Sequence, residues 1–142
     1  MKPAFWDSSS VVPLCVQQQA SPIVRRLARQ YGVVVWWCTP VEARSAFARL
    51  VRKGEITPAE RVLAEDSLEQ LRDRWREVLP LDSVRAEAEG LLRQFSLRAA
   101  DAMQLVAAMT WTMGRPQGRV FICGDAALLE AARQLGFQAV EA

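Results

Sequence analysis

Apolar and polar residues follow two alternating patterns along the chain. Short runs rich in β-branched and aromatic residues predict buried strands. Longer amphipathic segments that open on a capping residue or a proline and end at glycine predict helices. The predicted strands cover residues 4–7, 33–38, 119–125 and 137–140, and a fifth, shorter strand is possible at 77–82.

The predicted helices alternate with these strands. They cover residues 21–32, 39–54, 57–78, 83–95, 96–114 and 126–136. Two of them open in the same way, with Thr39-Pro40 and Thr57-Pro58 each followed by a glutamate that suits a capping box. We expect these two helices to form a hairpin.

Strands that alternate with helices indicate an α/β fold, in which a mostly parallel sheet is covered on both faces. We predict a single domain over residues 1–142, with four or five strands. Ligands of such sheets bind at the carboxyl ends of the strands. Asp7 ends the first predicted strand, Glu42 follows the second, and Asp125 follows the fourth, so three acids are expected at one edge.

A fourth acid, Asp101, interrupts the apolar helix "LRAADAMQLVAAM". With Ser96 as the N-cap, Asp101 lies beyond the first turn, where the helix dipole helps little. A buried carboxylate needs compensation. Either Arg98, three residues earlier, or a bound cation can provide it.

Each of the other three acids also has a purely structural explanation. Asp7 can be an N-cap or an Asx-turn residue with the serines that follow it, Glu42 can complete its capping box, and Asp125 can cap the last helix. Four carboxylates gathered at one edge, however, repel one another and raise one another's pKa unless a cation holds them. The set as a whole therefore favours a cation site.

Composition narrows the chemistry of such a site. The chain has no histidine, which excludes Ser-His-Asp and Cys-His catalysis and most zinc sites. Its three cysteines lie far apart, so a disulfide framework is not expected. Oxygen ligands without histidine or cysteine point to Mg²⁺ or Mn²⁺.

The distribution of charge points to a polyanionic substrate. The net charge is +2, but residues 55–89 contain ten acids and five arginines, a balance of −5, which leaves +7 for the rest. Carboxylates that hold a metal within a basic background suit cleavage of a phosphodiester backbone. No signal peptide or bilayer-spanning run is evident, so we expect a cytoplasmic protein with no membrane partner.

Together these motifs resemble the PIN-domain family, in particular its small VapC-type toxins. The resemblance runs from "FWDSSSVVPL" to "GFQAV" and includes "TPVEARSAFARL", "LRAADAMQLVAA" and "FICGDAALLEAARQLG". It implies a three-layer PIN-like fold and a Mg²⁺- or Mn²⁺-dependent endoribonuclease. Such toxins are often homodimers, and a cognate antitoxin reaches into their acidic site. Two positions depart from the family pattern, with Cys123 in place of Thr or Ser and Gln104 in place of a frequent His.

Our hypothesis assigns a role to each candidate residue. Asp7 and Asp101 are the primary metal ligands, Glu42 is a further ligand or a base that orients water, and Asp125 is a supporting ligand. Ser8 and Ser9 support the site, and the candidates for RNA contact are Arg98, Arg44, Arg25 and Arg29, with Arg26, Arg49 and Arg52 as further helix arginines.

Two other classes of protein compete with this hypothesis. One is a PIN-like binding module without catalysis. The other is a Mg²⁺-binding receiver-like or phosphotransferase domain, which also gathers acids at strand ends. That class generally needs a lysine near the phosphate, and the chain has only Lys2 and Lys53.

Overall fold

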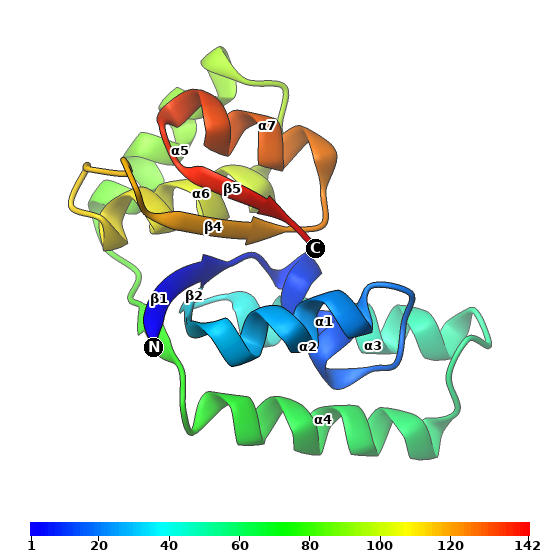
Figure 1. Cartoon of the computed structure of the whole chain (residues 1–142). Coiled ribbons are helices and arrows are strands. Elements are labelled where there is room, and N and C mark those ends of the chain that lie inside the picture. Colours follow the sequence, from blue (N-terminus) through cyan, green and yellow to red (C-terminus); the bar gives the residue numbers. More distant parts are fainter.

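A five-stranded parallel sheet forms the centre of the computed structural model, which describes residues 1–142 (Figure 1). Its order, β3-β2-β1-β4-β5, places the first strand in the middle. All neighbouring strands pair in parallel. The strands are β1 (Lys2–Trp6), β2 (Tyr31–Trp36), β3 (Arg76–Val78), β4 (Val120–Cys123) and β5 (Gln138–Glu141).

Helices cover both faces of this sheet (Figure 1). One layer holds the first four helices, and the other holds the last three. The helices are α1 (Ser8–Cys15), α2 (Ser21–Gln30), α3 (Thr39–Arg52), α4 (Pro58–Arg72), α5 (Asp82–Gln94), α6 (Ala99–Trp111) and α7 (Ala126–Leu135).

Alternate side chains of β1 supply the two halves of the core. Ala4 and Trp6 pack among the residues of α1 to α4, while Phe5 packs on the other face with α5 to α7. All three side chains are fully buried. This pattern follows from the period of two in a strand that is covered on both faces, and it confirms the predicted three-layer α/β architecture.

The predicted helical hairpin is formed by α3 and α4. The capping box at the start of α4 is present, because Thr57 accepts from the backbone of Glu60 and the Glu60 side chain accepts from that of Thr57. Ala64 and Leu68 bury one face of α4 against the core, and the rest of this charged helix is largely exposed. The charged face of α4 therefore lies on the outside of the fold.

Several predicted boundaries and one omission need correction. The helix predicted at 57–78 ends at Arg72, because residues 76–78 instead pair with β2 along the edge of the sheet. The helix predicted at 21–32 ends at Gln30, and Gly32 lies within β2. Helix α1 was not predicted, since Val11, Val12 and Pro13 are poor helix formers.

None of the helices is long and apolar enough to cross a membrane.

Candidate functional site

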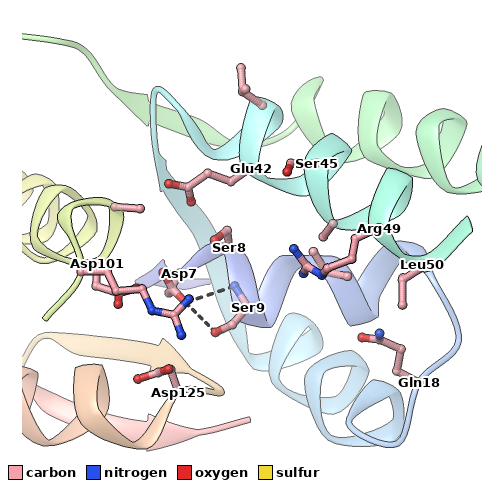
Figure 2. A pocket seen from close by; sticks show the side chains of 15 residues that line it. Asp7, Ser8, Ser9, Gln18, Glu42, Ser45, Arg49, Leu50, Asp101 and Asp125 are labelled. Atoms are coloured by element: carbon pink, nitrogen blue, oxygen red, sulfur yellow. Dashed lines mark hydrogen bonds between the residues drawn. The ribbon is translucent and has the colours of Figure 1, made fainter. Parts of the chain in front are cut away.

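All four candidate acids line one cavity of about 560 Å³ at the carboxyl end of the central strands. Asp7 follows β1, Glu42 lies in the first turn of α3, Asp101 lies in α6, and Asp125 precedes α7. Figure 2 shows their carboxylates facing a common space from four different elements. The parallel topology thus brings together residues that are far apart in the sequence.

Asp7 is the deepest of the four acids, with 3% of its surface exposed. It caps α1, as its structural explanation predicted, and its Oδ2 accepts from the backbone N–H and the hydroxyl of Ser9. Its Oδ1 has no partner in the protein, yet it is not sealed from solvent. Burial raises the pKa of Asp7 from 3.8 to about 6, and the charges of Glu42 and Asp101 add to the rise.

Glu42 does not form the capping box that the sequence predicted. Helix α3 begins at Thr39, whose own side chain is buried and makes no capping bond. Instead, Glu42 Oε2 accepts a hydrogen bond of 2.7 Å from Gln104 Nε2 on α6, while Thr39 Oγ1 lies 3.3 Å from the same nitrogen. The capping box predicted for Glu42 is therefore wrong. Its Oε1 has no hydrogen-bond partner in the protein, so this oxygen can bind a ligand in the cavity.

Asp101 occupies a different place on its helix than predicted. Helix α6 begins at Ala99, after Arg98 in an extended conformation, and the preceding Phe95 and Leu97 pack against the core, so Asp101 lies in the first turn. It is half-buried rather than fully enclosed. Burial and the charge of Asp125 raise its pKa, while the backbone N–H and the charge of Arg98 oppose the rise. Arg98 nevertheless makes no ion pair with it.

Asp125 lies at the exposed rim of the cavity and caps α7 as predicted. Its Oδ1 accepts from the backbone N–H of Leu128 at 2.9 Å, which leaves Oδ2 without a protein partner. The neighbouring Cys123 is fully buried, with its Sγ 3.7 Å from Asp7 Oδ2 and 3.2 Å from the Asp125 nitrogen. Burial raises the pKa of the Cys123 thiol to about 12, so it stays protonated beside Asp7.

The negative charge of this site has no ion-pair partner within the protein. None of the salt bridges includes any of the four acids. Their donors are all oxygens, which suit Mg²⁺ or Mn²⁺, and Asp7, Glu42 and Asp125 each have one oxygen without a protein partner. No three acidic or thiol side chains converge closely enough to form a finished ligand set. The residues therefore fit a cation that keeps several of its waters, as Mg²⁺ usually does.

Only one of the four arginines proposed for RNA contact lines the cavity. Arg98 is there, and so is Arg49, which the sequence placed among the further candidates. Arg44 is instead held by Glu65 at 2.9 Å and by Glu69 at 2.7 Å, so it ties α3 to α4. Two other arginines lie elsewhere on α2, where Arg25 bonds Gln17 and Arg29 is exposed.

Helical spacing identifies one further residue of the site, Ser45, that the sequence analysis did not assign. Glu42, Ser45 and Arg49 lie three and seven positions apart on α3, so they share one face and line the cavity together (Figure 2). Ser8 and Ser9 line it as well, as predicted for supporting residues. The contact between Glu42 and Gln104 joins α3 to α6, and no local sequence pattern indicates it.

The receiver-like alternative does not agree with this structure. No lysine lines the cavity. The strand order β3-β2-β1-β4-β5 also differs from the order 2-1-3-4-5 of receiver folds. This alternative is therefore set aside.

Comparisons with known proteins support the fold. No protein-family model matches the chain, and no curated protein matches it. Among solved structures, the chain is similar to the structure of FitAB bound to an IR36 DNA fragment, with a TM-score of 0.62 and 16% sequence identity. The similarity covers 97% of this chain and 94% of that chain. This likeness confirms the PIN-like fold class that the sequence predicted.

Proposed function

We propose that this protein is an endoribonuclease that requires Mg²⁺ or Mn²⁺ and acts as the toxin of a toxin–antitoxin pair. The observation that carries the proposal is the gathering of four carboxylates from separate elements around one cavity, without an ion-pair partner. The PIN-like fold and the resemblance of the motifs to VapC-type toxins support the same function.

Some residues of the cavity would bind a cation directly, and others orient the carboxylates that bind it. Ser9 fixes one oxygen of Asp7, so the other oxygen is left for a ligand. Gln104 fixes one oxygen of Glu42 in the same way. Asp101 completes the group of acids, and Asp125 supports it from the rim. When bound, the cation supplies activation of water and neutralises charge that develops on the phosphate.

Arg49 and Arg98 are suited to hold the RNA backbone. Both side chains are exposed, and both line the acidic cavity without an acidic partner of their own. Guanidinium groups bind phosphate oxygens through two parallel hydrogen bonds. An RNA strand across the cavity would therefore meet positive charge beside the carboxylates.

Cleavage of a mixed-sequence single-stranded RNA with Mn²⁺ tests the proposal. We expect Asp7→Ala and Asp101→Ala to lose at least about 100-fold in rate, because each removes a proposed metal ligand. Asp66→Ala, an exposed acid of α4 without an ion pair, is the control and should cleave like the wild type.

Two other outcomes have distinct meanings. Equal cleavage by the wild type and both aspartate variants contradicts the mechanism. RNA that is bound but never cut assigns the cavity to a binding module. The same assay with single-stranded DNA of matching sequence should show little cleavage, since the resemblance points to RNA.

Two protein partners also belong to this proposal. The resemblance implies a cognate antitoxin that inserts into the acidic cavity, and a second copy of the chain as a homodimer partner, both in the cytoplasm. Light scattering after gel filtration tests the dimer. Co-expression with the adjacent short reading frame tests the antitoxin, which should co-purify with the protein and suppress cleavage.

A further inference from the structure

Gln104 is the one side chain with a polar atom that is both sealed from solvent and without a hydrogen-bond partner. It lies on α6 with 1% of its surface exposed, among apolar neighbours such as Leu105. Its Nε2 donates to Glu42 Oε2 at 2.7 Å and lies 3.3 Å from Thr39 Oγ1. Its Oε1 is sealed from solvent and has no partner at all. A buried acceptor without a donor destabilises a fold.

The orientation of this amide is set by Glu42. If the amide were flipped, Oε1 would face a carboxylate oxygen at 2.7 Å, and two acceptors cannot bond each other. In the observed orientation, Nε2 therefore donates to Glu42 and Oε1 is left without a hydrogen-bond donor. An apolar side chain of similar size would fill the same space without leaving an orphan acceptor, so packing alone does not explain a glutamine here.

We infer that Gln104 is a positioning residue for Glu42, which it holds in place for a divalent cation. This inference rests on the proposed function, because it assigns Gln104 a role in the same cation site. The donor is neutral, so it fixes the carboxylate without cancelling the charge that a cation needs. Groups that orient metal ligands in this way raise metal affinity, and their loss typically costs about 10-fold to 100-fold.

Titration of metal-free protein with Mn²⁺ tests this role without relying on activity. We expect Gln104→Met to raise the Mn²⁺ dissociation constant at least about 10-fold. The melting temperature of metal-free Gln104→Met should equal or exceed that of the wild type, because the orphan acceptor is gone. Gln104→His, which retains an N–H donor, should recover most of the affinity.

Two further variants separate positioning from general packing. Val106→Ala, at another buried position of α6, should lower the melting temperature and leave the Mn²⁺ dissociation constant unchanged. In a Glu42→Gln background, Gln104→Met should have no additional effect on Mn²⁺ affinity, because its only route to the metal is already removed.

The possible results lead to different conclusions. Wild-type Mn²⁺ affinity in Gln104→Met, or an equal loss in the Glu42→Gln background, would overturn the positioning role while leaving the proposed function intact. If the wild type itself binds no Mn²⁺, then the metal site fails and the inference fails with it.

Discussion

At the scale of single residues, Asp7 has two roles that favour different states of its carboxyl group. Its Oδ2 caps α1 and accepts from Ser9, which favours the charged form, whereas burial favours the neutral form and dominates. Without a cation, the burial of the Asp7 carboxylate therefore lowers the stability of the folded protein near neutral pH. A cation opposite Oδ1 would reverse that balance.

The raised pKa of Asp7 predicts how stability depends on pH in the metal-free protein. Its pKa is about 6 in the folded state against 3.8 in the unfolded state, so the folded state binds the proton more tightly. The stabilisation is complete below about pH 4 and is lost as pH rises through 6, by about 2–3 kcal/mol.

Asp7→Asn provides the test, since asparagine also caps helices and does not titrate. In denaturant unfolding with a chelator present, the wild type should lose stability relative to Asp7→Asn between about pH 4 and pH 6.5, and the difference should then stay constant at higher pH. Asp66→Asn, altered at an exposed position, should follow the wild type. Parallel curves for the wild type and Asp7→Asn would contradict the pKa shift.

The sequence allowed single residues of the site to be predicted where a local rule applied. Asp7 and Asp125 could be placed because each follows a strand with a clear apolar pattern and has a local capping role, although the helix that Asp7 caps was not itself predicted. The capping box proposed for Glu42 was wrong, because Gln104, which lies 62 positions further along the chain, binds it instead. Nothing local to either residue indicates that contact.

At the scale of elements, α3 carries residues with two different functions on two faces. One face presents Glu42 and Arg49 to the cavity, and the other directs Arg44 toward Glu65 and Glu69 of α4. The sequence grouped these arginines together because each suits RNA contact by charge alone. Their partners on α4 could be assigned only once the packing of the hairpin was known.

This division predicts different effects for Arg44 and Arg49 of α3, and Arg98, which precedes α6, should behave like Arg49. Arg49→Ala and Arg98→Ala should each weaken RNA binding, whereas Arg44→Ala should leave it unchanged and lower stability by less than about 1 kcal/mol, since its ion pairs are partly exposed. Fluorescence anisotropy with single-stranded RNA and unfolding in urea measure the two effects.

Salt dependence gives a second check on the same two arginines. With two phosphate contacts to a single strand, the logarithm of the binding constant should fall with the logarithm of salt concentration with a slope of about −1.4. Removing either arginine should halve this slope. A slope unchanged in both variants would place the RNA elsewhere on the surface.

At the scale of the whole molecule, the parallel sheet creates the site. The order β3-β2-β1-β4-β5 puts β1 at the centre, so Asp7 lies between the acids that follow β2 and β4. The alternation of strands and helices made this edge predictable from the sequence. The start of α6 was not predictable in the same way, because it depends on how Phe95 and Leu97 pack against the core.

The central claim is that the four acids share a site for a divalent cation, and a titration with Mn²⁺ followed by calorimetry and thermal unfolding tests it most directly. We predict that Mn²⁺ binds the wild type and raises its stability by about 2.7 kcal/mol at a hundredfold excess over the dissociation constant. Asp101→Asn should fold normally in the absence of metal and show a much smaller response. A response that is undiminished in Asp101→Asn, or absent from the wild type, would contradict the claim.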